Sequence, residues 1–249
     1  MNTKYWIDYF TNRKDSYQDP DWSQICTLND PHQKHALGKS LAIFQLGETG
    51  GGTRLLRFAQ KIATPDQYPN YQEAIQLFIQ EEQEHARLLK HLVLHLEGKL
   101  LEQQWSNSVF RRFRGVINLE FNIQVLLTAE LIAEVYYGLL ARYVNDPVVK
   151  DVAQKILRDE VKHIAFHHDF FRHRFSNLSP ARALLWNSQF KTIHSLTTIV
   201  VWHDHQACLN SLGIPRSRFM TLAREKCRFF LHGLTKPAPK PLGLFTSNR

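Results

Sequence analysis

The chain has 249 residues, of which 43% are apolar and 22% charged, as in an ordinary soluble globular protein. This composition excludes a disordered, low-complexity or collagen-like chain. Lysine and arginine outnumber aspartate and glutamate by 31 to 23, and the resulting net charge of +8 favours an acidic partner or a phosphate group without indicating a fold.

Signals for a membrane span or for export are not apparent. No apolar run approaches the ~18 residues that a membrane-spanning helix needs, and the first ten residues lack the apolar core of a secretory signal. Cys26, Cys208 and Cys227 are too widely spaced for a cysteine-based metal site and argue against a disulfide framework. We therefore expect a cytoplasmic protein that does not span a membrane.

Apolar residues recur at helical spacing along most of the chain, with almost no strand-like alternation. Proline and glycine mark the ends of several segments, for example Gly98 after one helix and Pro147 at the start of another. Together these signals predict helices over roughly residues 33–62, 71–98, 107–144, 147–175, 180–211 and 216–233.

The order of these segments predicts one all-α domain over residues 1–249, because no internal repeat or linker divides the chain. Residues 33–175 would form a four-helix core, residues 179–233 two accessory helices, and residues 234–249 a proline-rich tail. The aromatic side chains of residues 1–30 would pack on the bundle.

Charged residues interrupt the apolar faces of two predicted helices. The run E-E-Q-E-H places Glu82 and His85 at i, i+3, and D-E-V-K-H places Glu160 and His163 at the same spacing. Each pair shares the apolar face of its own helix, where an ionised carboxylate is too costly unless it is paired or bound to a metal. Carboxylate oxygen and imidazole nitrogen are ligands that suit iron or manganese.

The other two core helices offer further carboxylates. Glu48 is the candidate in the 33–62 helix, and Glu130 and Glu134 are the candidates in the 107–144 helix. Glu160 lies about 14 residues beyond the turn at Asp146, whereas Glu130 lies about 16 and Glu134 about 12 before it. In two antiparallel helices, residues at equal distance from the turn lie at equal height. His163 lies about 17 residues beyond the turn, so Glu130 is level with the pair of Glu160 and His163. Glu130 is therefore the first choice of ligand and Glu134 the second.

Four carboxylates and two histidines on four helices are the ligands of di-iron and di-manganese sites in ferritin-like bundles. On these residues the chain resembles the ferritin-like di-iron carboxylate superfamily over residues 33–175. Its two runs are similar to the paired motifs of the oxygen-activating members, such as acyl-carrier desaturases and aldehyde-deformylating oxygenases. The resemblance implies an all-α, ferritin-like four-helix bundle with two additional C-terminal helices.

The resemblance also implies a ligand arrangement and a cofactor. Glu82 and Glu160 would bridge two metals; Glu48 with His85 would complete one metal, and Glu130 with His163 the other. The cofactor would be two Fe, with Mn/Fe and Mn/Mn as alternatives.

Residues around the six ligands have candidate supporting roles. Asp159 and Glu81 each precede a bridging glutamate, and the resemblance implies that Asp159 orients His85 and Glu81 orients His163; the alternative is a solvent-facing acid. Tyr137 would hydrogen-bond a ligand, with a radical role as the alternative. His167 shares the ligand face, as a further ligand or as a packed core histidine.

Two other motifs have open interpretations. The stretch G-E-T-G-G-G-T at 47–53 indicates a kink or π-bulge beside Glu48, or close packing of a crossing helix; a phosphate-binding loop lacks its strand and lysine. The cluster R-R-F-R at 111–114 is a basic patch for an acidic partner or an ordinary solvated helix end.

The resemblance implies a non-haem di-metal oxidoreductase that activates O2 to oxidise a small organic or fatty-acyl-type substrate. Such an enzyme needs an electron donor such as a ferredoxin, and it could use an acidic carrier protein and form a homodimer. The alternative is a ferroxidase, metal-handling or peroxide-scavenging protein, although residues 176–249 extend beyond a compact storage unit. A nucleic-acid substrate is supported only by the net charge. A metal-free interaction module is a further alternative, but it would leave the buried glutamates unexplained.

Overall fold

The computed structural model describes residues 1–50, 52–62, 68–105 and 119–235. The elements among these residues are all helices, as the sequence predicts. The chain divides into two compact units, Met1–Ile123 and Gln124–Arg249. The ferritin-like bundle and the single domain remain predictions.

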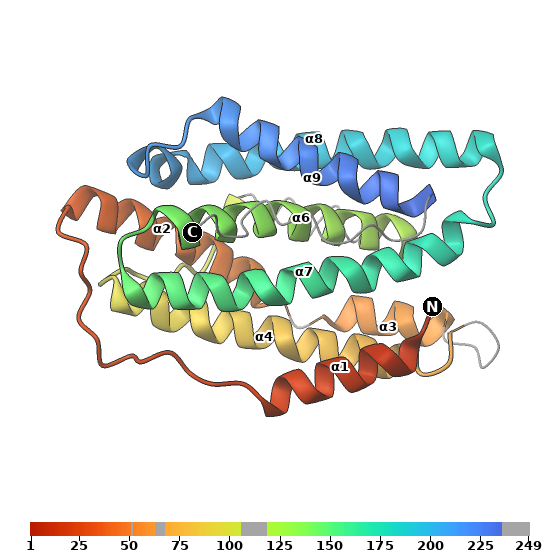
Figure 1. The fold of residues 1–249 in the computed structure, drawn as a ribbon, viewed down its shortest axis with the longest axis horizontal. Helices are drawn as coiled ribbons and strands as arrows, with labels where there is room; N and C mark the ends of the chain where they lie inside the picture. The colour runs from red at the N-terminus through yellow and green to blue at the C-terminus, as the bar shows by residue number, and fades with distance from the viewer. Residues whose placement is uncertain (51, 63–67, 106–118, 236–249) are drawn as a thin grey trace, which may run out of the picture. The chain divides into compact units, whose positions relative to one another are not determined.

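The first unit is organised around α4 (Tyr71–His95), which α1 (Thr3–Asp15), α2 (Pro31–Glu48) and α3 (Thr53–Ile62) all contact (Figure 1). Helix α1 was not predicted as a helix. Its Trp6 and Phe10 are buried, and the Phe10 ring meets Phe78 of α4 edge-on at a centroid distance of 6.3 Å. The N-terminal aromatic residues therefore pack on the helical core, as expected.

The predicted continuous helix over 33–62 is wrong, because α2 ends at Glu48 and α3 begins at Thr53. Gly52 has a φ of +57°, and a Cβ atom there would lie 2.4 Å from Cδ1 of Ile79 on α4. Only glycine combines this backbone conformation with so close an approach. The glycine-rich stretch thus separates two helices that both pack on α4, instead of kinking one helix.

Helix α4 ends at His95, slightly before the predicted residue 98. The amide of Gly98 donates to the Val93 carbonyl and that of Glu97 to the Leu94 carbonyl, which is a Schellman motif with Glu97 in the left-handed region at φ +55°. A Cβ on Gly98 would lie 3.0 Å from the Val93 carbonyl oxygen, so a larger residue at this position would have to displace that carbonyl by a few tenths of an ångström.

The second unit contains most of α6 (Leu119–Tyr143), together with α7 (Pro147–Phe175), α8 (Pro180–Ser211) and α9 (Arg216–Thr235). A proline opens both α7 and α8, and Asp146 Oδ1 accepts a hydrogen bond from the Val149 amide at 2.9 Å. Helices α6 and α7 run in opposite directions, and α9 packs on α7 and α8 (Figure 1). The bounds of α7 and α8 agree with the sequence analysis.

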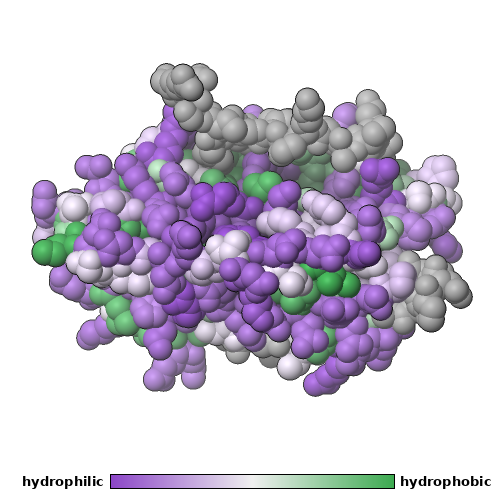
Figure 2. Space-filling model, turned by 60° about the horizontal axis from the view of Figure 1, so that its bottom comes forward, coloured by the Kyte–Doolittle hydropathy of each residue, from purple (hydrophilic) through white to green (hydrophobic). Residues whose placement is uncertain are grey.

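Helix α6 is the one described helix that is long and apolar enough to cross a membrane by length and composition, which the sequence analysis did not predict. In the structure 89% of its most apolar window is buried, as in the core helix of a soluble protein. The face of the molecule in Figure 2 is mostly hydrophilic, with hydrophobic residues in small separate groups.

Helix α8 contains two buried histidines, His194 and His205, and burial lowers the pKa of each from 6.5 to about 4. The His205 ring packs against Tyr136 at a centroid distance of 5.2 Å. A histidine with a depressed folded-state pKa contributes stability that is present above the unfolded-state pKa and is lost as the pH falls toward the folded-state pKa.

We therefore predict that the metal-free protein loses about 2 kcal/mol of unfolding free energy through His205 alone between pH 7.5 and pH 5. Urea denaturation in a chelator at the two pH values measures the loss. The His205→Asn variant should lose less than the native chain by this amount. An equal loss in both proteins would show that His205 is not held neutral by the fold.

Candidate metal centre

The first pair of candidate ligands lies on α4. His85 is fully buried, and its Nδ1 atom lies 3.9 Å from Oε1 of Glu82, whose side chain is 14% exposed. Neighbouring residues on the same helix, Phe78, Ala86 and Leu89, are buried. The helical spacing therefore brings a carboxylate and an imidazole together on an apolar surface.

The second pair lies on α7 and is more deeply buried. Nδ1 of His163 lies 3.8 Å from Oε2 of Glu160, and the two side chains are 0% and 2% exposed. Ile156 and Phe166, one turn to either side, are completely buried. This carboxylate is therefore surrounded by apolar packing.

Glu130 of α6 joins the α7 pair. Its Oε2 lies 3.8 Å from Nδ1 of His163, and its Oε1 lies 3.5 Å from Nε2 of His167. Both Glu130 oxygens are buried and accept no hydrogen bond. Distances of 3.5–3.8 Å are long for hydrogen bonds between these atoms. Donor atoms about 2 Å from a shared metal ion lie roughly 3–4 Å apart, so the spacing fits a ligand set.

Glu134, one helical turn from Glu130, has a different partner. Its carboxylate forms a buried ion pair with Nζ of Lys226 on α9. Burial raises the pKa of Glu134, and the Lys226 charge opposes that rise. Glu134 is thus compensated by a lysine, whereas Glu130 faces the histidines.

Sequence reasoning missed Lys226, although the sequence contains a signal for it. Phe219, Ala223 and Phe230 are buried at helical spacing along α9, and Lys226 falls within that apolar stripe. A lysine in such a position predicts a buried acid on a neighbouring helix.

The other predicted site residues occupy varied environments. Glu48 is the last residue of α2 and is half-buried. Oε1 of Glu81 lies 3.9 Å from Nε of Arg13 on α1. Asp159 is 1% exposed, and the buried Tyr137 packs edge-on against Tyr136. Their roles in a metal centre remain predictions.

Two sequence predictions lie outside the described residues. They are the R-R-F-R cluster at 111–114 and the proline-rich tail beyond residue 235.

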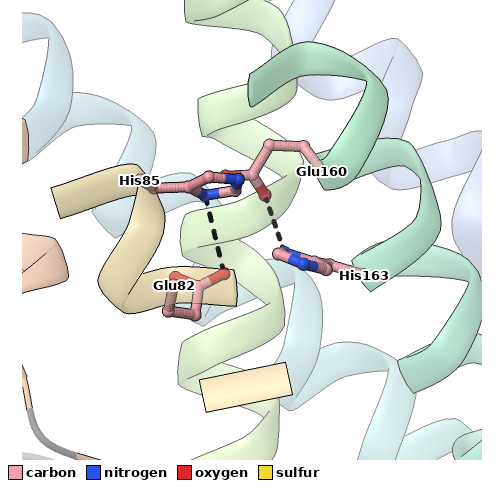
Figure 3. Close-up of side chains that lie close together, drawn as sticks. All are labelled: Glu82, His85, Glu160 and His163. Carbon is pink, nitrogen blue, oxygen red and sulfur yellow. Dashed lines mark ion pairs between the residues drawn. The ribbon is translucent and has the colours of Figure 1, made fainter. Parts of the chain in front are cut away.

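One ligand atom from each of Glu82, His85, Glu160 and His163 lies within 4.8 Å of the other three (Figure 3). This His/Glu group is buried except for the half-buried Glu82, and it could hold a metal ion. The two carboxylates and two imidazoles suit iron, manganese or zinc, so the donor set alone does not select the metal.

Comparisons with protein-family models and with curated proteins find no match to this chain.

We predict that Glu130→Ala and Glu134→Ala change different properties of the protein, metal binding in the first case and stability in the second. Glu130→Ala should reduce metal binding while the metal-free protein keeps its stability, because an uncompensated buried carboxylate is removed. Glu134→Ala should leave Lys226 buried without a carboxylate and cost about 3–5 kcal/mol of unfolding free energy, with a smaller effect on metal binding.

The measurements are elemental analysis after anaerobic ferrous loading and urea denaturation in a chelator. Glu134→Gln, which keeps the side-chain volume, separates the loss of charge from the loss of packing. Greater metal loss in Glu134→Ala than in Glu130→Ala would contradict the assignment of Glu130.

Proposed function

We propose that the chain is a non-haem di-metal oxidoreductase, with two iron ions as its cofactor, that uses O2 to oxidise a small organic or fatty-acyl-type substrate. The observation that carries this proposal is the buried group of Glu82, His85, Glu160 and His163. Glu130 would bind beside His163, and Glu48 would complete the ligand set from α2.

Charge balance supports a metal centre over a purely structural role. Glu130 and Glu160 both approach His163 Nδ1 at 3.8 Å, and both carboxylates are buried. Two carboxylates that converge in an apolar interior repel each other and lose their hydration, unless positive charge is supplied. Divalent cations supply that charge, and neutral histidines provide the remaining ligand atoms.

The surroundings favour redox chemistry on an apolar molecule over hydrolysis. The two Glu/His pairs lie in an environment poor in water, because the apolar side chains beside them are at most 1% exposed, namely Phe78, Ile156 and Phe166. When bound, two iron ions supply the capacity to reduce oxygen. The contribution of the side chains is to fix the ligand atoms on long helices and to exclude water from the site. Turnover would require an electron donor such as a ferredoxin.

The first test compares the metal content of ligand variants with that of a matched control. After anaerobic ferrous loading and desalting, the native chain should retain about two irons. Glu82→Ala and Glu160→Ala should lose most of this metal while their helical circular dichroism persists. Glu84→Ala removes an acid of α4 that pairs with Arg87 instead, and it should retain the metal.

Exposure of the loaded protein to O2 then separates the two functional hypotheses. The proposed oxidoreductase should consume O2 quickly at two irons per chain and should stop without a reductant. Continued iron uptake with mineral formation at higher loading would instead show a ferroxidase or storage protein. Full metal retention in Glu160→Ala would contradict the site itself.

A further inference from the structure

Positive charge is concentrated in one part of the second unit. Residues 170–235 contain nine arginines and lysines but only two acids, Asp204 and Glu225. This segment therefore carries most of the net charge of +8. Between Asp169 and Asp204 the chain has no acidic residue at all.

Helix α8 exposes aliphatic side chains within the same region. Leu184 and Leu185 are 73% and 69% exposed, and Leu196 and Ile199 are 60% and 47% exposed. At about 100° per residue these four side chains fall within an arc of about 120°, over about 22 Å of helix. The exposed residues between them on this arc are small and uncharged, namely Ser188, Thr192 and Ser195. We call this surface the α8 face.

Basic side chains border the α8 face. On the helical wheel Arg182 lies beyond one edge and Lys191 beyond the other, and both are exposed. The end of α7 adds Arg172 and Arg174, and it packs beside the start of α8, where the Phe175 and Trp186 rings lie 5.6 Å apart. The two acids that flank the α8 face in sequence are Asp169, which is half-buried on α7, and Asp204 on α8 itself, whose side chain is only 4% exposed.

We propose that the α8 face docks on an anionic lipid surface, with its leucines and isoleucine among the acyl chains and its basic border against the phosphates. This combination of exposed aliphatic side chains and flanking cations is the chemistry of interfacial helices. Each basic residue near an anionic bilayer contributes an attraction that corresponds to roughly fivefold in partitioning.

Other occupants fit this surface less well. A second copy of the chain would bring the same basic borders together, because a two-fold interface repeats one patch on both sides. Nucleic acid would gain little from aliphatic side chains, since single strands stack on aromatic rings. Protein interfaces favour aromatic residues, which the α8 face lacks.

The test is co-sedimentation of the full, metal-free chain with vesicles of phosphatidylcholine alone or with one quarter phosphatidylglycerol. Binding should need the anionic lipid and should weaken with salt. Leu184→Ser with Leu185→Ser should lower the partition coefficient at least about tenfold, and Arg182→Gln with Lys191→Gln about 25-fold. The matched control, Leu94→Ser with Leu100→Ser, removes exposed leucines elsewhere and should bind like the native chain.

Four results would overturn the proposal. The first two are an absence of binding to anionic vesicles and binding that persists in the leucine double variant. The third is a native dimer that dissociates in this variant, without any vesicle binding. The fourth is tighter binding to nucleic acid that depends on the same residues. Since the assay uses metal-free protein, its outcome is independent of the proposed metal chemistry.

Discussion

The burial of carboxylates on apolar helix faces is the constraint on which the rest of this structure depends. A buried carboxylate that is neither paired nor metal-bound costs more free energy than the packing around it contributes. The second unit places two buried acids, one helical turn apart on α6, in different surroundings. Glu134 has the ammonium group of Lys226, whereas Glu130 has the rings of His163 and His167 and no hydrogen bond to its own oxygens.

The helical scaffold explains why Glu130 and Glu134 meet different partners. Asp146 caps α7 immediately after the short connection from α6, so the distance of each residue from that turn sets its height. Glu130 consequently meets the histidines of α7, and Glu134 meets α9. Ligands on long continuous helices keep their relative positions without support from loops, which suits a centre that must bind metal ions in a fixed geometry.

The sequence predicted those structural features whose cause lies within one helix or one turn. The starts of α7 and α8 follow from a proline after a capping residue, and the i, i+3 spacing alone places Glu160 beside His163. Counting residues from the turn distinguished Glu130 from Glu134 as neighbours of His163. Long-range causes were missed: the break at Gly52 depends on Ile79, and the partner of Glu134 lies 92 residues away. The position of Glu81 near Arg13 likewise depends on α1, a helix that the sequence analysis did not predict.

The most direct test of the proposed metal centre is the X-ray absorption spectrum of the ferrous-loaded chain at the iron edge. A di-iron centre at these residues should give a first shell of oxygen and nitrogen, outer-shell scattering from roughly one imidazole per iron, and a second iron as a neighbour. Absence of both the imidazole and the iron–iron scattering would contradict it, because the iron would then be bound outside the group of Glu82, His85, Glu160 and His163.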